Sequence, residues 1–374
     1  MERKMKITTS KDNLLKGIQA VQNAVSNKST LPILSHILLE AKKDGIKLVA
    51  TDLEIGVSVL VSGEVFEEGA ITIPARKFSE IIKELSGDEA INISVKKSQS
   101  ITIESNKSYF RLMGLLKEDF PQLPEFPSQG AKNIDFIKIP QKLLKNMIQL
   151  TSFAMSHDET RYVLNGILFS FKDKTLKLVA TDGRRLAVIE KQVTEIGNTK
   201  KDAIIPMKTI QELSRNLTEE GEVTFCFKEN QLQINLGQIT ITSRLIEGEY
   251  PNYEQVIPKK IREEFKIKTE DFLQATRRAS ILTHQDSQSV KINILKDKMI
   301  ITKNTPELGD SREELDVDYK GTELSIGFNP AFLIDVLKNI EGDSVKFGFT
   351  DPEKPAVIRS GDDYTYIVLP MQVA

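Results

Sequence analysis

The sequence of 374 residues contains one cysteine, no tryptophan and only three histidines. The single cysteine, Cys226, cannot form a disulfide within the chain, which is typical of proteins from a reducing compartment. Its two phenylalanine neighbours belong to an alternating apolar run, which predicts a buried strand thiol rather than a nucleophile. Because His36, His157 and His284 are isolated from one another, the sequence offers no metal-ligand spacing.

Long apolar runs and a strong net charge are also missing. No run approaches the ~18 apolar residues of a membrane-spanning helix, and the charged residues 1–6 are not followed by the apolar core of a signal peptide. We therefore expect a soluble, cytoplasmic protein. The net charge of −2 argues against a partner that is held mainly by overall attraction to phosphate.

The sequence likewise lacks the motifs of the common catalytic classes. It has no phosphate-binding glycine loop, no dinucleotide fingerprint and no exposed-serine elbow. The motif Leu-Val-Ala-Thr-Asp occurs twice, ending at Asp52 and at Asp182. Paired acids can serve acid–base or metal chemistry, but Thr-Asp after an apolar strand is also ordinary turn chemistry. The turn interpretation is favoured, so the sequence predicts no catalytic residue, no metal and no cofactor.

What the sequence does contain is a repeat of long period. A short strand that leads into a helix occurs around Leu15, Leu144 and Leu273, and successive leucines are 129 residues apart. A second strand–helix signature follows in each copy. Ser10 and Thr269 occupy the expected N-cap positions of two of these helices. The expected helices cover residues 10–25, 75–86, 140–153, 207–217, 270–282 and 330–340.

Between the helices the apolar residues alternate, as at residues 91–95 and 239–243, which predicts half-buried antiparallel strands. The predicted fold class is therefore α+β, with three tandem copies of one domain and two helices packed on antiparallel sheets in each copy. Such a repeat can serve simply as a scaffold. The predicted domains and the linkers between them are 1–125, 133–253 and 254–374, with linkers at 121–132 and 250–264.

The expected helices carry more positive charge than the rest of the chain. They hold twelve basic and seven acidic residues, so +5 falls on the helices and −7 elsewhere. Ordinary solvated helix faces would explain this split. Alternatively, all the helices line one mildly positive surface that faces a polyanion, and weak neutralisation of phosphates would let a duplex slide. No recognition-helix or zinc-finger pattern is present, so sequence-specific contacts are not expected.

Several stretches of the sequence resemble the family of bacterial DNA polymerase III beta subunits, the sliding clamps, along essentially the whole chain. Each stretch is moderately specific alone, but together they occur in order on a threefold repeat. The matching stretches are LPIL at 31–34, TDLE at 51–54, RYVLNG at 161–166, ATDGRRLA at 180–187, LIEGEYPNY at 245–253 and YIVLPM at 366–371.

The resemblance implies clamp-type domains in a head-to-tail homodimer that closes into a ring around duplex DNA. The protein would be a non-catalytic accessory subunit that binds DNA topologically and without sequence preference. It would tether the replicative polymerase, and the clamp loader and the repair and mismatch proteins would bind through short linear motifs. The ring joint would combine Phe110 and Leu112 of one chain with Ile281 and Leu282 of the other, although packing in a domain core is an alternative role for these apolar residues.

The resemblance also assigns two sets of binding residues. The partner pocket, between the second and third domains, would comprise Leu164, Thr181, Gly183, Arg184, Arg185, Leu186, Pro251, Val256, Ile367, Leu369, Pro370 and Met371. The DNA contacts would be Lys28, Arg76, Asp158, Tyr162 and Val163.

Three positions depart from the family pattern. Arg184 stands where many relatives have histidine, and Gln372 stands where a basic residue is common, so different peptide flanks are expected. Asp158 places a carboxylate where phosphate would approach, which is unfavourable. Two other functions compete with the clamp. One is a scaffold that binds peptides but not DNA, and the other is a hydrolase that uses Asp52 or Asp182.

Overall fold

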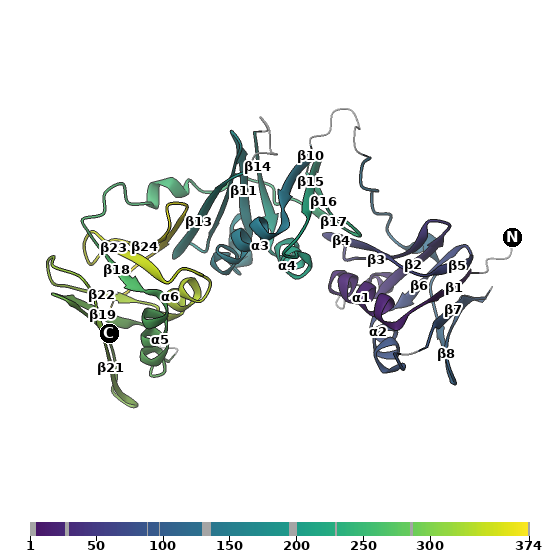
Figure 1. Ribbon diagram of the computed structural model, residues 1–374, viewed down its shortest axis with the longest axis horizontal. Helices are drawn as coiled ribbons and strands as arrows, with labels where there is room; N and C mark the ends of the chain where they lie inside the picture. Colours follow the sequence, from purple (N-terminus) through teal and green to yellow (C-terminus); the bar gives the residue numbers. More distant parts are fainter. Residues whose placement is uncertain are drawn as a thin grey trace. The chain divides into compact units, whose positions relative to one another are not determined.

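The computed structural model describes residues 5–26, 30–87, 89–96, 98–128, 136–193, 200–228, 230–284 and 287–372. The chain forms two compact units, and Figure 1 labels their helices and strands along the sequence. The first comprises Met1–Lys142 and Gln211–Leu245, and the second comprises Leu143–Ile210 and Ile246–Ala374. The strands of the middle repeat are therefore divided between the two units, because its sheets continue into the sheets of its neighbours.

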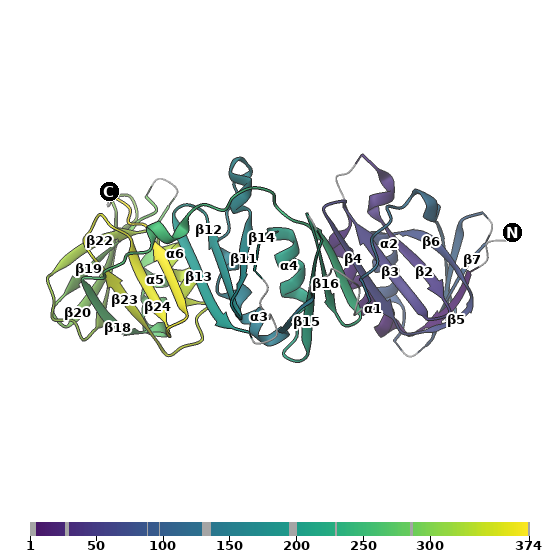
Figure 2. The same cartoon turned by 90° about the horizontal axis from the view of Figure 1, so that it is seen from above.

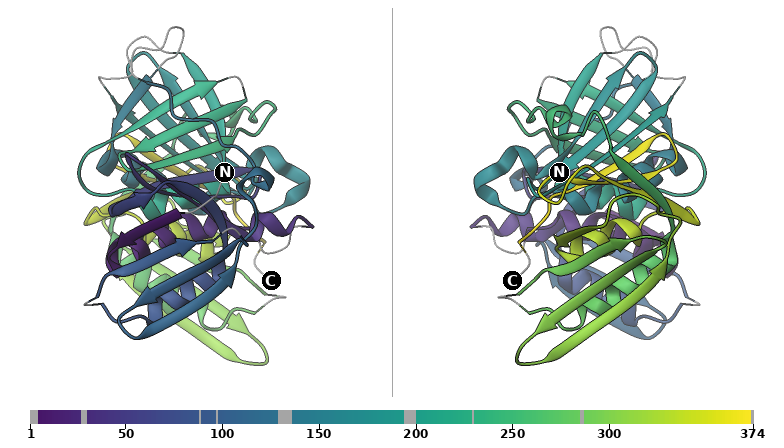
Figure 3. Two further views of the ribbon diagram at one scale, coloured as in Figure 1. Left: turned by 90° about the vertical axis from the view of Figure 1, so that its right-hand side faces the viewer. Right: turned by 90° about the vertical axis from the view of Figure 1, so that its left-hand side faces the viewer.

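The first unit contains a five-stranded and an eight-stranded sheet, and every strand pairing in them is antiparallel. The five-stranded sheet faces the viewer in the left panel of Figure 3. Its order is β5 (Glu64–Glu67), β1 (Met5–Thr9), β7 (Ile91–Val95), β8 (Ser100–Ser105) and β9 (Ser108–Met113). The order of the larger sheet is β10 (Phe136–Pro140), β15 (Glu222–Lys228), β16 (Gln231–Leu236), β17 (Ile239–Arg244), β4 (Ile55–Val61), β3 (Gly45–Thr51), β2 (His36–Lys42) and β6 (Gly69–Pro74).

The second unit has an eight-stranded and a four-stranded sheet, again antiparallel throughout. The four-stranded sheet lies in front in the right panel of Figure 3. The larger sheet runs β14 (Lys201–Pro206), β11 (Gly166–Lys172), β12 (Thr175–Thr181), β13 (Arg185–Gln192), β25 (Tyr364–Val368), β24 (Ala356–Ser360), β23 (Ser344–Phe349) and β18 (Glu263–Lys268). The smaller runs β21 (Gly309–Asp316), β20 (Lys298–Thr305), β19 (Val290–Leu295) and β22 (Leu324–Phe328).

Each larger sheet contains a seam at which strands of successive repeats pair. In the first unit β17 pairs with β4, and in the second unit β13 pairs with β25. Figure 2 shows β13 beside the yellow strands of the third repeat. Backbone hydrogen bonds thus join neighbouring repeats directly, which explains why the compact units do not follow the repeat boundaries.

The six expected helices are present, but they are shorter than the sequence windows. They are α1 (Lys11–Val21), α2 (Ala75–Glu84), α3 (Gln141–Gln149), α4 (Met207–Asn216), α5 (Thr269–Ser280) and α6 (Pro330–Leu337).

The two N-cap predictions have different outcomes. Ser10 caps α1 as predicted, because its hydroxyl accepts a hydrogen bond from the Asn13 backbone N–H at 3.3 Å. The prediction for Thr269 is wrong. Lys268 occupies the cap position of α5, and the Thr269 hydroxyl instead donates to the carbonyl of Gly342 at 2.6 Å.

Alternating apolar residues form the cores as predicted. Cys226 lies on β15 and is fully buried, so the prediction of a strand thiol is confirmed. Burial raises the pKa of the Cys226 thiol, since the charged thiolate would lose its hydration. No helix in the described part of the chain is both long and apolar enough to cross a membrane.

Candidate partner cleft, DNA-facing segment and open sheet edges

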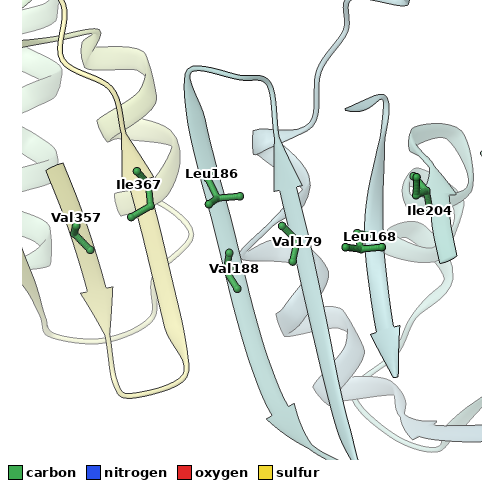
Figure 4. Close-up of a cluster of buried hydrophobic side chains, with 7 residues drawn as sticks. All are labelled: Leu168, Val179, Leu186, Val188, Ile204, Val357 and Ile367. Carbon is green, nitrogen blue, oxygen red and sulfur yellow. The ribbon is translucent and has the colours of Figure 1, made fainter. Parts of the chain in front are cut away.

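A cluster of buried apolar side chains spans the seam of the second unit, and we call it the cleft floor after the partner pocket that the resemblance predicts there (Figure 4). The side chains come from neighbouring strands of one sheet, and at the seam Leu186 of β13 is paired with Ile367 of β25. Both repeats therefore contribute to one continuous surface. The cleft floor consists of Leu168, Val179, Leu186, Val188, Ile204, Val357 and Ile367.

The linker from the second to the third repeat packs against the cleft floor. Tyr250 and Tyr253 lie against it, and the Tyr250 hydroxyl donates to the carbonyl of Val179 at 3.3 Å. Pro251 and Val256, on the same linker, are exposed, and Val256 retains 48% of its surface. The linker thus covers part of the cleft floor, and Pro251 and Val256 leave apolar side chains open to solvent.

The predicted pocket residues fall into a buried set and an exposed set. Leu164, Leu186 and Ile367 are buried, so they shape the cleft from beneath. Leu369 and Met371 each expose 38% of their surface and form an apolar rim. The intermediate or exposed members of the predicted set are Thr181, Gly183, Arg184, Arg185, Pro251, Val256 and Pro370.

Residues 181–185, which we call the rim turn, have the local geometry that the sequence predicted. The Asp182 Oδ1 atom accepts hydrogen bonds from the backbone N–H groups of Arg184 at 2.9 Å and Arg185 at 3.0 Å. Gly183 has φ +84°, a conformation that glycine adopts without strain. Asp52 accepts the same two backbone bonds in the first repeat. Both carboxylates therefore serve as turn acceptors, which confirms the turn interpretation.

The side chain of Arg185 lies behind the cleft, where 10% of it is exposed. Its guanidinium donates to Asp182 at 3.0 Å, to Asp335 of α6 at 2.7 Å and to the carbonyl of Phe153 at 2.6 Å. It also stacks over the Phe332 ring, 4.5 Å from the centroid. Arg185 therefore joins the second repeat to the third and supports the rim turn from beneath.

The electrostatics of this network follow from burial and pairing. Burial alone would lower the pKa of Arg185, but the hydrogen bond to Asp335 and nearby negative charge raise it. Burial alone would raise the pKa of Asp335, but hydrogen bonds from Arg185 and Lys338 bring it below its ordinary value. Each partner thus keeps the other charged.

The predicted DNA contacts lie on two elements, and Lys28 lies outside the described residues. Arg76 lies on α2, where its side chain is 88% exposed and pairs with Glu80 at 2.9 Å. Tyr162 is 57% exposed and Val163 is half-buried, and both belong to the 3-10 helix Glu159–Leu164.

Asp158 is partnered within its own segment. Its carboxylate accepts from the Thr160 hydroxyl at 2.6 Å, from the Thr160 N–H at 3.0 Å and from Arg161 Nε at 3.1 Å, and these bonds lower the pKa of Asp158. The charge of this carboxylate is therefore balanced locally. Arg161, its partner, stands within the RYVLNG stretch, but the sequence analysis did not single it out.

The predicted ring-joint residues lie near open edges of two sheets. Phe110 and Leu112 belong to β9, the last strand of the five-stranded sheet. Ile281 follows α5 and is 74% exposed, and Leu282 is half-buried. Core packing, the alternative role for these residues, does not describe Phe110 or Ile281, because both are exposed.

The seam of the first unit has the same strand pairing but different side chains. Thr242 is paired with Gly56 there, and Gln233 is paired with Thr242. In the second unit the corresponding residues are Ile367, Leu186 and Val357. Small and polar groups thus replace three members of the cleft floor.

The linker between the first and second repeats lies on part of this first seam. A Cβ atom on Gly56 would lie 2.5 Å from Leu123 Cδ1, so the linker leucine rests directly on the glycine. The Gln233 amide donates to the linker carbonyls of Pro124 at 3.0 Å and Glu125 at 3.2 Å. The linker between the first and second repeats is therefore anchored at the first seam, at the positions that correspond to the apolar cleft floor of the second unit.

Tandem antiparallel sheets that are joined across seams, with an apolar cluster at one seam, are typical of a modular binding scaffold. Within the described ranges, no group of three or more His, Cys, Asp or Glu side chains is placed to hold a metal ion. The chain matches the models of the DNA polymerase III beta subunit in three parts. These are the N-terminal domain at residues 5–124, the central domain at 138–252 and the C-terminal domain at 254–372.

Individual relatives agree over the full length. The Beta sliding clamp of Chlamydia muridarum is 32% identical over 369 residues, which is 99% of both chains. That of Pseudomonas aeruginosa is 35% identical over 373 residues, 99% of this chain and all of the relative.

Solved structures agree as well. The Bacillus subtilis sliding clamp has a TM-score of 0.93 at 32% identity, and the Pseudomonas aeruginosa clamp bound to griselimycin has 0.92 at 34%. Each comparison covers 99% of this chain and 100% of the other. The chain belongs to the DNA polymerase III beta subunit family: it is a DNA sliding clamp with three tandem clamp domains, an accessory subunit that works with DNA and its polymerase.

Proposed function

We propose that two copies of the chain close head to tail into a ring that encircles duplex DNA without catalysing a reaction. Each copy contributes domains at 1–125, 133–253 and 254–374. The ring tethers the polymerase catalytic subunit, the clamp loader and repair and mismatch proteins through the cleft, and it acts in the cytoplasm on the nucleoid.

The observation that carries this proposal is the character of two of the edge strands, β9 and β21, which end the two smaller sheets. β9 bonds only to β8, and β21 bonds only to β20, so each strand presents an open row of backbone groups. Such edges invite another strand unless something covers them. β9 carries one arginine and no carboxylate, whereas β21 carries four carboxylates and one arginine. Opposite charge favours the joining of unlike edges, which is a head-to-tail contact.

The proposed joint also accounts for the exposed apolar residues. Phe110 and Leu112 of one chain would meet Ile281 and Leu282 of the other, which would remove these side chains from water. Such heterologous contacts close when the rotation between copies suits a ring. Topology then retains the DNA, so Lys28, Arg76, Tyr162 and Val163 need to supply only weak phosphate contacts, as the modest helix charge allows.

The proposed joint is tested by Phe110→Asp, with Phe66→Asp as the matched control. Phe66 is 59% exposed on β5, the opposite edge strand of the same sheet. We expect wild-type protein and the control to have about twice the 42.1 kDa chain mass in solution, and Phe110→Asp to be a monomer. Equal masses for the two variants would refute the proposed joint.

Encirclement is tested by loading the protein on nicked circular DNA and then cutting the circle once. We expect a loader-dependent complex that survives gel filtration on the circle and is lost after linearisation. Retention on linear DNA would instead indicate binding by affinity. A scaffold that does not use DNA would show no retention in either case.

The cleft is proposed as the binding site for short linear motifs. An apolar floor with a few polar groups at its rim suits the anchoring side chains of such peptides. The Pseudomonas aeruginosa relative has been solved with griselimycin bound, and we propose that griselimycin occupies the cleft of this chain. A hydrolase that uses Asp52 or Asp182 gains no support, since turn backbone N–H groups occupy one oxygen of each carboxylate.

A further inference from the structure

The rim turn is bonded on one side to the segment that carries the candidate DNA contacts. The Arg161 Nη1 atom donates to the carbonyl of Asp182 at 3.2 Å, and its Nε atom donates to Asp158 at 3.1 Å. A Cβ atom on Gly183 would lie 2.8 Å from Arg161 Nη1, so the guanidinium lies against the glycine. Arg161 therefore covers the rim turn and at the same time belongs to the DNA-facing segment at residues 158–163.

On its other side the rim turn positions the cleft. The Arg184 carbonyl accepts a hydrogen bond from Leu369 N–H at 3.0 Å, which fixes the apolar rim to the turn. Leu186 follows the turn directly and is paired with Ile367 in the cleft floor. A change at the rim turn therefore reaches both the rim and the floor of the cleft.

The DNA-facing segment also contacts the cleft floor directly. Val163 packs against the floor cluster. A Cβ atom on Gly248, whose φ is +125°, would lie 3.0 Å from Val163 Cγ1 and 3.3 Å from the Tyr162 hydroxyl. Two independent contacts, one polar and one apolar, thus join this segment to the cleft within the same unit.

A phosphate can compete for the Arg161 guanidinium. The side chain is 49% exposed, and its partner Asp158 is 40% exposed, so neither is sealed from solvent. Phosphate oxygens bind guanidinium with the same geometry as a carboxylate and often by two parallel hydrogen bonds. The arginine thus has two alternative sets of acceptors, one in its own chain and one in the DNA backbone.

We propose that Arg161 is a positioning residue through which DNA in the clamp opens the partner cleft. Without DNA, the guanidinium is held by Asp158 and Asp182 and covers Gly183. With DNA, it turns to a phosphate, uncovers the glycine and frees space at the rim for a bound motif. The inference rests on the proposed function, because it requires both a DNA-facing segment and an occupied cleft. Linkage requires that an occupied cleft also favours DNA.

The test measures binding of fluorescein-labelled griselimycin by anisotropy, with and without a saturating short duplex at low salt. For the wild-type protein we expect DNA to tighten binding by about fivefold, the lower end of typical coupling between two sites. Arg161→Ala should bind the probe without DNA as tightly as wild type does with DNA, and added duplex should change nothing. Asp158→Asn, which weakens the grip on the guanidinium, should be intermediate.

Two controls separate the possible failures. Arg359→Ala removes an arginine of the same unit that faces Glu264 at 4.0 Å, and it should retain the wild-type response to DNA. The salt dependence of duplex binding should lose about one unit of slope in Arg161→Ala, as for one phosphate contact. If Arg161→Ala weakens griselimycin binding with and without DNA, the residue only supports the rim and the inference is wrong.

Failure of the proposed function gives a different result. Wild-type protein would then bind no griselimycin, or no duplex, under any of these conditions. Normal binding of both ligands with equal griselimycin affinity in the presence and absence of duplex would overturn the inference alone.

Discussion

Replacing Arg185 with alanine should destabilise the second unit strongly, although the residue stands next to an exposed turn. The side chain makes three hydrogen bonds, to Asp182, Asp335 and the carbonyl of Phe153, and stacks over Phe332. Two of these bonds join opposite charges at partly buried positions. Arg185→Ala removes all four interactions and leaves two carboxylates with fewer donors.

The magnitude follows from what remains after the change. A hydrogen bond to a charged group contributes about 1.5–3 kcal/mol, and breaking a buried ion pair costs about 3–5 kcal/mol. Asp182 keeps its backbone donors and Asp335 keeps Lys338, so the loss lies at the low end of that range. We expect about 3 kcal/mol. For a unit of roughly 200 residues this lowers the melting temperature by about 6–12 °C.

The assay is differential scanning calorimetry, because a chain of several domains need not unfold in one step. Tyrosine circular dichroism can follow the same region, since the chain has no tryptophan and Tyr366 lies beside Arg185. The matched control is Arg184→Ala, in the same turn but exposed, which should change stability by no more than about 0.5 kcal/mol.

A double-mutant cycle identifies the interaction responsible. If Arg185 and Asp335 stabilise each other, alanine at both positions should cost less than the sum of the two single changes, by about 1–3 kcal/mol. Additive effects, or equal melting temperatures for Arg185→Ala and Arg184→Ala, would refute the assignment of Arg185 as the link between repeats.

Further predictions concern acid stability, the cleft and the buried thiol. Because the folded pKa of Asp335 lies below its ordinary value of 3.8, its contribution is present above about pH 4 and is lost at lower pH; the stability difference between wild type and Asp335→Asn should therefore shrink in acid denaturation series below pH 4. Leu369→Ala should weaken griselimycin binding about tenfold through lost apolar burial, whereas Leu308→Ala, at another exposed leucine, should leave the anisotropy titration unchanged. Cys226 should react with a thiol reagent at pH 8 only after denaturant is added, because the thiol is buried and its pKa is raised; rapid modification of native protein would contradict its burial.

The features that the sequence predicted well are those encoded by short-range pattern. Helical spacing of apolar residues predicted the positions of α1 to α6. A few residues around Asp52 and Asp182 were enough to predict that their carboxylates accept turn hydrogen bonds. Helix ends were placed less well. At Thr269 a bond to the distant carbonyl of Gly342 decided the outcome, and no local pattern encodes that bond.

The features that the sequence did not predict depend on long-range pairing. The order of the three repeats along the sequence does not indicate that the middle repeat is divided between two compact units. That division follows from which edge strands of successive repeats pair, and this pairing is determined only in the folded chain. The stretch Asp182 to Leu186 has the composition of a solvated turn, yet Arg185 folds inward because Asp335, 150 residues later, lies beneath it. Arg161 was missed for the same reason, because its partner Asp182 is 21 residues away.

The contact of Leu123 with Gly56 affects which seam of the chain is open to partner proteins. Leu123 and the carbonyls of Pro124 and Glu125 take up part of the first seam, so the two seams of a chain present different surfaces. If the cleft at the second seam is the partner site that we propose, a chain holds one partner there at a time, and a second partner binds after the first has dissociated. Competition between partners for a given chain would then be decided by residence time and local concentration. A substitution of Leu123 would change the first seam without touching the cleft.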